Sequence, residues 1–207
     1  MGFRAAEELD GIVARHHLND HPFYRAWRAG TLPRAALSAY AADYAPFIAA
    51  VEAGWRTLGE DAHAAEEREH ARLWVRFRDA LGVPEEAARR PNPQAAALTA
   101  HAERLFAEPV TALGALYAFE AQQPSTARSK LDGLCERYGL SEDAAAYFRA
   151  HADDYGERDR LAARAEALSR MDLAIARQAC EQACLAMWAV LDGAMGDAAE
   201  ACAMGPA

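Results

Sequence analysis

The chain has 207 residues, of which 52% are hydrophobic and 26% are charged, which is ordinary usage for a globular domain with a sizeable core. Its 31 acidic residues outnumber the 22 lysines and arginines, so the formal net charge is −9, and no basic cluster stands out. This pattern argues against nucleic acid or an anionic membrane surface as a partner, and no apolar run approaches the roughly 18 residues that span a bilayer.

Apolar residues recur with helical spacing along almost the whole chain, and no segment alternates convincingly as a strand. Breaks carry proline or glycine, as in "RAGTLP", "LGVPEE" and "YGLSED". Pro46 predicts a kink in the second helix, and Pro124 predicts another one turn beyond Glu120. We predict one all-α domain over residues 1–207, a single bundle of about seven helices. The predicted helices span residues 4–17, 34–57, 60–81, 93–106, 110–136, 141–168 and 171–203.

Two features favour a cytoplasmic protein. The first residues, "MGFRAAEELDGIVARHH", form an amphipathic pattern that contains acids, unlike a signal peptide. Cys180 and Cys184 lie one helical turn apart on the apolar stripe of the last helix, where we expect small core residues rather than a disulfide or a ligand pair. An exposed apolar helix face also predicts a homodimer.

The third predicted helix combines an apolar stripe with groups that bind metals. The stripe ends in "LWVRF", and His70 heads it on the core face. Glu67 precedes His70 by three residues, and this E-x-x-H spacing lets two side chains on one face share a metal. Glu66 and His63 lie on the same face and remain alternatives to Glu67.

Another acid is directed at the core from the fifth predicted helix. Glu120 continues the apolar stripe that begins at Leu113, since seven residues return to nearly the same angle. An unpaired buried carboxylate costs several kcal/mol or takes up a proton. We therefore expect Glu120 to meet a metal ion or a buried cation such as Arg158 or Lys130.

The sixth predicted helix carries a third set of polar groups on a face with core aromatic residues. These groups are His151, Asp154, Tyr155 and Arg158. Any one such residue is more often a hydrogen-bonded core group, but three helices with inward acids and imidazoles predict a metal site or a polar active site. Carboxylate and imidazole ligands suit iron, manganese or zinc. A purely structural polar network is the alternative.

The order of four motifs resembles the haem-oxygenase-like superfamily. The motifs are "HPFYRAWRAGTLPRAALSAYAADYAPF", "EEREHARLWVRFRDALGV", "LYAFEAQQPSTARSKLDGL" and "YGLSEDAAAYFRAH". Within it, the chain is similar to the TENA/THI-4 and PqqC-like branch, nearest to the iron-containing, di-iron oxidases related to the chlamydial protein associating with death domains. This resemblance implies a haem-oxygenase-like fold, one or two irons, and dioxygen as co-substrate.

In those oxidases the ligands are a Glu and a His from one helix, a bridging Glu from a second, and H-x-x-x-D-x-x-H from a third. The resemblance implies three ligands on matching motifs, which are His70, Glu120 and His151. Glu67 or Glu66 is then the first-helix acid, and His63 takes that place if the longer family spacing holds.

The ligand motif H-x-x-x-D-x-x-H, which begins at His151, departs from the family pattern in this sequence. Tyr155 stands four residues after His151, where the family has Asp, and Arg158 stands where it has His. Asp154 is one position early and reaches the site only through a local bulge or an unwound turn. A Tyr and an Arg in such a pocket also resemble the cofactor-free, PqqC-like members, which hold acidic substrates and oxygen with His, Tyr and Arg.

One subgroup of these oxidases is thought to make 4-aminobenzoate with tyrosines and a lysine of its own chain. The residues at the matching positions here are Tyr24, Tyr40, Tyr147 and Lys130. Buried tyrosines with satisfied hydroxyl groups are the simpler interpretation.

The leading hypothesis is an iron-dependent oxidase or oxygenase that uses dioxygen on a small amino-acid-like or carboxylate substrate in a biosynthetic pathway. Its predicted metal ligands are Glu67, His70, Glu120, His151 and Asp154. Its predicted catalytic residues are Tyr155, Arg158, Lys130 and Tyr24. Arg158 is expected to bind a substrate carboxylate, because its planar fork fits one bidentately. The alternatives are a metal-free PqqC-like oxidase and a non-catalytic binding or scaffold protein with a decayed metal site.

Overall fold

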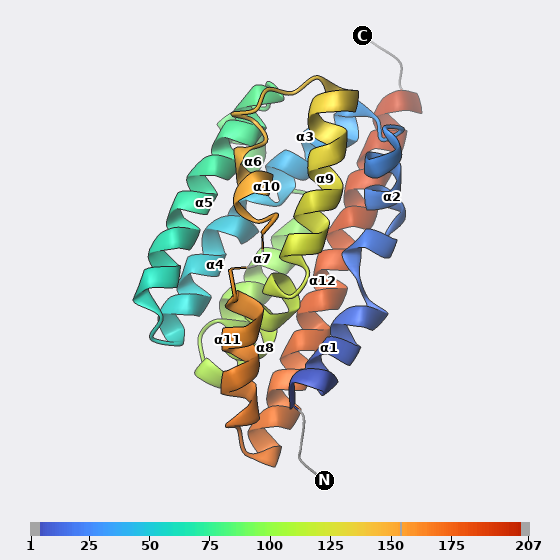
Figure 1. The fold of residues 1–207 in the computed structure, drawn as a ribbon. Helices are drawn as coiled ribbons and strands as arrows, with labels where there is room; N and C mark the ends of the chain where they lie inside the picture. Colours follow the sequence, from blue (N-terminus) through green and yellow to red (C-terminus); the bar gives the residue numbers. More distant parts are fainter. Residues whose placement is uncertain (1–4, 154, 204–207) are drawn as a thin grey trace.

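The computed structural model describes residues 5–153 and 155–203, except the side chains of residues 132, 135 and 197–203. Asp154, one of the predicted ligands, therefore lies outside the described residues. The fold is an elongated helical bundle (Figure 1). In chain order its elements are α1 (Ala5–Arg15), the 3-10 turn η1 (Leu18–Asp20), α2 (Pro22–Ala29), α3 (Arg34–Asp43), α4 (Ala45–Thr57), α5 (Asp61–Ala80), α6 (Glu85–Ala88), α7 (Pro93–Leu105), α8 (Pro109–Glu120), α9 (Gln123–Tyr138), α10 (Ala146–Ala150), α11 (Glu157–Glu166) and α12 (Arg170–Ala203).

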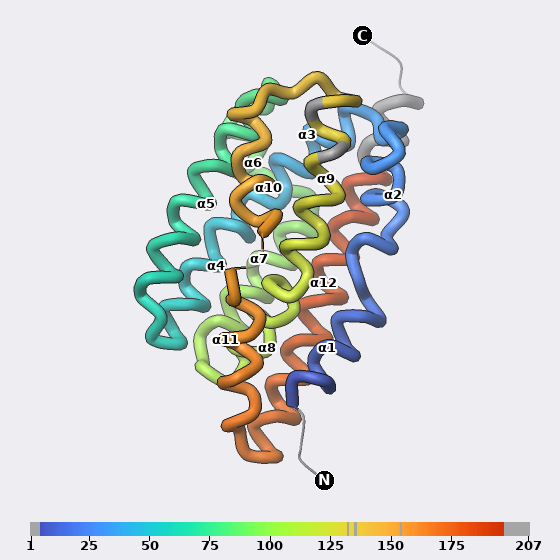
Figure 2. The backbone as a smooth tube through the Cα atoms, viewed as in Figure 1, coloured from blue at the N-terminus to red at the C-terminus, as the bar shows by residue number. Residues whose placement is uncertain are grey.

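The bundle is built around α8 and α12. The long helix α12 runs along most of the molecule and packs against α8, α7, α3 and α1 (Figures 1 and 2). All residues of α8 from Ala112 to Glu120 are buried. The two helices meet closely at Gly114, where an added Cβ would lie 2.0 Å from the carbonyl oxygen of Ala176. Glu120 thus ends a helix that is enclosed by the rest of the fold.

The predicted all-helical class is confirmed, since every regular element of the described residues is helical. The predicted core role of Cys180 and Cys184 also agrees with the structure, in which both thiols are buried and free. No helix among the described residues has the length and apolarity needed to cross a bilayer.

The expected number of about seven helices is too low, because three long predicted helices are divided and neither α2 nor the short α6 was predicted. Pro46 and Pro124 cause two of the divisions. Each lies in the first turn of a new helix, α4 or α9, and does not kink a continuous one. Proline is tolerated there because the first N–H groups of a helix have no intrahelical partner.

The third division separates α10 from α11 within the predicted helix 141–168. Gly156 adopts a left-handed conformation with φ of 89° directly before α11. Residues with a Cβ rarely adopt this conformation, whereas glycine does so without strain. The chain therefore changes direction between His151 and Glu157, and the helical phase of α10 does not continue into α11.

Candidate metal centre

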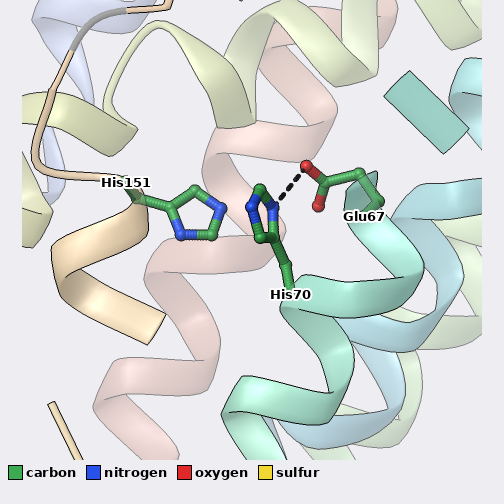
Figure 3. A group of neighbouring side chains, drawn as sticks. All are labelled: Glu67, His70 and His151. Atoms are coloured by element: carbon green, nitrogen blue, oxygen red, sulfur yellow. Dashed lines mark hydrogen bonds and ion pairs between the residues drawn. The ribbon is translucent and has the colours of Figure 1, made fainter. Parts of the chain in front are cut away.

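Two ligand-type side chains come from one turn of α5. Glu67 is 4% exposed, and its Oε1 accepts a hydrogen bond of 2.9 Å from Nδ1 of His70 (Figure 3). Burial disfavours the charged form of His70, but this hydrogen bond and the charge of Glu67 outweigh it, so the pKa of His70 is raised. Glu66 is exposed. The structure thus places Glu67, and not Glu66, against His70.

His151 faces His70 from the end of α10 (Figure 3). The centroids of the two imidazole rings are 4.2 Å apart. Nδ1 of His151 lies 2.8 Å from the carbonyl oxygen of Tyr147, which can only accept, so Nδ1 carries the proton and Nε2 presents a lone pair. Burial, helped by the charge of His70, lowers the pKa of His151 to about 4. His151 is therefore neutral at pH 7, the form in which histidine binds metals.

Glu67, His70 and His151 line one small pocket, which we call the metal pocket. Glu120 lines the same pocket. It is buried, and its Oε1 accepts a hydrogen bond of 3.0 Å from Nε1 of Trp55. Burial, followed by the charge of Glu67, raises the pKa of Glu120 well above its ordinary value. Two buried carboxylates therefore repel each other at a place where a bound cation would attract both.

The donor set fits a divalent metal ion. One ligand atom from each of Glu67, His70 and His151 lies within 4.8 Å of the others, which suits side chains that share one ion with bonds of about 2.0–2.3 Å. Within the described part of the chain, Oε2 of Glu67 and Nε2 of His151 are buried without a hydrogen-bond partner. Buried polar atoms are rarely left in this state unless water or an ion satisfies them. Mixed carboxylate and imidazole ligands suit iron, manganese or zinc.

The break after α10 separates the remaining residues of the third predicted set. Tyr155 is 66% exposed and lines the pocket from its rim. Arg158 instead pairs with Asp10 of α1 and with Asp159, and its guanidinium carbon lies 5.8 Å from the centroid of the Tyr117 ring. The prediction that Arg158 lines the pocket is therefore wrong, because its fork already holds a carboxylate of the same chain. His63, the other first-helix candidate, stacks on Trp55 with ring centroids 4.8 Å apart.

A second buried polar cluster surrounds Lys130 of α9. Its Nζ donates a hydrogen bond of 3.2 Å to the hydroxyl of Tyr40 and lies 4.3 Å from the centroid of the Tyr24 ring. The hydroxyl groups of Tyr24 and Tyr40 are 3.0 Å apart. Burial lowers the pKa of Lys130 to about 7. The cavity beside these side chains has a volume of only about 10 Å³, room for roughly one water molecule.

Tyr147 and Gln123 lie between the metal pocket and the Lys130 cavity. The ring centroids of Tyr147 and His151 are 4.3 Å apart. Nε2 of Gln123 donates a hydrogen bond of 3.2 Å to the Tyr147 hydroxyl, and Gln123 lines both spaces. The two sites are therefore neighbours, separated by one pair of side chains.

The site includes three residues that were not predicted. Trp55 orients Glu120, Gln123 separates the two sites, and Glu157 lines the metal pocket. Gln123 lies in "FEAQQP" close to Glu120, and Glu157 lies between Tyr155 and Arg158. Their positions in the sequence were the only features that could have indicated Gln123 and Glu157 as site residues. No feature of the sequence indicated Trp55.

The fold and the pocket together define a helical protein with a candidate site for a divalent metal ion inside the bundle. The family described as iron-containing redox enzymes matches residues 21–189, and the chain belongs to this family. It is therefore an iron-dependent oxidoreductase. This finding goes against the two alternatives of a metal-free oxidase and a non-catalytic scaffold.

The chain is similar in sequence to proteins named 4-aminobenzoate synthase. It is 31% identical to the one from Chlamydia muridarum over 90% of this chain and 88% of the relative. It is 30% identical to the one from Nitrosomonas europaea over 90% of this chain and 89% of the relative. The chain thus matches most of the length of both relatives.

Two solved structures show the same fold. A TenA homologue from Pseudomonas syringae pv. tomato superposes with a TM-score of 0.77 at 18% identity, over 93% of both chains. A domain of unknown function with a haem-oxygenase-like fold, from Shewanella denitrificans, has a TM-score of 0.71 at 19% identity, over 93% of this chain and 89% of that one. The predicted haem-oxygenase-like fold is therefore confirmed.

Proposed function

We propose that this chain forms 4-aminobenzoate from its own side chains, with Lys130 as the source of the amino nitrogen and Tyr24 as the source of the aromatic ring. The activity named for the two bacterial relatives supports the product. The contact between the Lys130 amine and the Tyr24 ring supports the origin of its atoms. Glu67, His70, Glu120 and His151 would hold the iron, which would supply the oxidising chemistry by activating dioxygen.

The small volume of the Lys130 cavity is the observation that carries this proposal. A volume of about 10 Å³ admits a water-sized molecule but no aromatic substrate. An aromatic ring and an amine are nevertheless already present there, with Nζ of Lys130 4.3 Å from the centroid of the Tyr24 ring. The reacting groups are therefore proposed to belong to the chain, and only small molecules need to enter.

The protonation state of Lys130 suits a nitrogen donor. The new bond joins Nζ of Lys130 to the ring carbon that loses the Tyr24 hydroxyl oxygen as water. The Cε–Nζ bond of Lys130 and the Cα–Cβ bond of Tyr24 break, and dioxygen is the oxidant that turns Cβ into the carboxyl carbon. An amine forms such a C–N bond through its lone pair, which is absent from an ammonium group. Because burial lowers the pKa of Lys130 to about 7, a substantial fraction of the chains holds a neutral amine at pH 7. An exposed lysine, with a pKa near 10.4, holds well under 1% of its amine in that form.

Isotope labelling tests the proposal. Chain produced with 15N at the lysine ε-position and 13C in the tyrosine ring is loaded with Fe(II) without oxygen and then exposed to air. We expect 4-aminobenzoate that carries both labels, at no more than one molecule per chain, and none from Lys130→Met or Tyr24→Phe. Unlabelled 4-aminobenzoate, or many molecules per chain, would rule out the chain as the source.

A second candidate function is the oxidation of a free small carboxylate on the outer side of the metal pocket. A vestibule of about 430 Å³ opens there, large enough for a small ligand, and Arg160 lies in its wall. This function predicts repeated turnover with an added substrate, and it predicts that Lys130→Met keeps that turnover. Oxygen consumption by the variant in the presence of small carboxylates separates the two candidates.

A further inference from the structure

The metal pocket has an outer opening with one carboxylate in it. The pocket and the vestibule share four lining residues, which are His70, Ala150, Tyr155 and Glu157. Of these four, Glu157 alone carries a carboxylate. Glu66 lines the vestibule but not the pocket. Glu157 therefore lies where the two spaces meet.

The turn before α11 gives Glu157 this position. Gly156 is left-handed, and Glu157 is the first residue of the helix that follows. The side chain is half-buried, in contrast to the exposed Tyr155 two residues earlier. The turn thus presents Glu157 to the pocket, while Arg158 turns to Asp10.

Glu157 lies between two walls of the pocket. It lines the pocket together with His70 of α5 and Glu120 of α8, whereas Glu66 is not part of that lining. Glu157 is thus close to groups from two different helices.

The two nearby arginines of α11 do not neutralise Glu157. Arg160 and Arg164 are both paired with Glu60 at the start of α5. The Glu157 side chain makes no hydrogen bond or ion pair with another residue in the part of the chain that the structure describes. A half-buried carboxylate beside two buried carboxylates is unfavourable without a cation.

We propose that Glu157 is a further metal-binding residue, which closes the outer side of the site formed by Glu67, His70, Glu120 and His151. The inference rests on the proposed iron site. It gives the centre three carboxylates and two imidazoles, a set suited to iron or manganese. It also supplies a carboxylate ligand beyond the break that follows His151.

Metal binding without turnover tests this assignment. The metal-free full-length chain is titrated with Co(II), whose visible absorption reports the number and type of ligands, and then with Fe(II) in competition. Glu157→Gln keeps the size of the side chain but removes its charge and one of its two ligand oxygens. Glu66→Gln is the matched control, because it makes the same change in the vestibule wall outside the pocket.

We expect Glu157→Gln to weaken Co(II) binding at least about tenfold and to shift its visible bands. Glu66→Gln should stay within about threefold of the wild type and keep the wild-type spectrum. Equal affinities and spectra for the two variants would overturn the assignment of Glu157. Circular dichroism confirms that both variants are folded.

The same titration separates this inference from the iron site on which it rests. If the wild type binds metal, Glu120→Ala abolishes binding and Glu157→Gln does not weaken it, only the role of Glu157 is refuted. If the wild type binds neither Co(II) nor Fe(II), the iron site itself is refuted, and the role of Glu157 with it.

Discussion

The buried amine of Lys130 leads to a quantitative prediction about stability. Lys130→Met keeps an unbranched side chain, one heavy atom shorter, and removes the ionisable group. The hydroxyl of Tyr40 and the ring of Tyr24 both contact Nζ, but neither is a carboxylate. A cation–π contact provides about 0.5–2 kcal/mol, less than the cost of burying an unpaired ammonium group. The charged form of Lys130 is therefore expected to destabilise the folded chain.

The magnitude follows from the pKa of Lys130, which burial lowers from 10.5 to about 7. Between these two values the unfolded chain binds a proton that the folded chain does not, so the free energy of unfolding of the wild type rises with pH. Each pH unit contributes at most about 1.4 kcal/mol, and the half-protonated state at pH 7 reduces the first step. The rise from pH 7 to pH 9 is therefore about 2 kcal/mol from this group alone.

Urea unfolding measures the contribution of Lys130 to the pH dependence of the free energy of unfolding. The wild type and Lys130→Met are compared at pH 7 and pH 9 with a chelator present. Other titrating groups contribute equally to both proteins and cancel in the difference. We expect the stability advantage of the methionine variant at pH 7 to shrink by about 2 kcal/mol at pH 9. A difference that is the same at both pH values would show that Lys130 is not neutralised by burial, and the argument for a neutral amine donor would fail.

Four further predictions concern the metal site, the helix packing and the assembly. Glu120→Ala should lose nearly all bound iron by elemental analysis while the helical circular dichroism remains, and full iron content would contradict the site. Trp55→Phe removes the N–H donor to Glu120 and should weaken Co(II) binding about tenfold, whereas an unchanged affinity would make that contact irrelevant. Gly114→Ala should lower the free energy of unfolding by about 3 kcal/mol or more, because its Cβ would meet backbone of α12, whereas Gly11→Ala has open space and should be neutral or stabilising; equal effects in urea unfolding would refute the close packing. The half-exposed Leu185 of α12 is expected to lie in a homodimer interface, so Leu185→Glu should halve the mass measured by light scattering, and a monomeric wild type would refute the dimer.

The parts of the site within one helix were predictable from spacing alone. Glu67 and His70 are three residues apart, and any regular helix brings such residues to one face. The inward direction of Glu120 followed in the same way from its apolar stripe. Trp55 could not be found by this reasoning, because its hydrogen bond to Glu120 joins two helices whose contact depends on the whole bundle.

The helix boundaries show a related difference. The long amphipathic helices α5, α7 and α12 begin and end within a few residues of the predicted positions. Pro46 and Pro124 were predicted to kink continuous helices, whereas each begins a new helix in the structure, and a proline can do either. Which of these occurs depends on how the two segments pack, as it does for α8 and α9 around Glu120.

The turn at Gly156 had the largest consequence for function, because it exchanges the residues that reach the pocket. On a continuous helix, Arg158 would return to the face of His151, whereas Glu157, six residues away at about 100° each, would lie about 240° round the helix. Helical periodicity therefore predicted that Arg158 lies beside His151 in the pocket, and it did not predict this for Glu157. The left-handed glycine ends that phase relation, and in the structure Glu157 lines the pocket while Arg158 pairs with Asp10. A single backbone conformation thus places a negative charge, rather than a positive one, beside Glu67 and Glu120, and this arrangement suits a bound cation better than an anionic substrate.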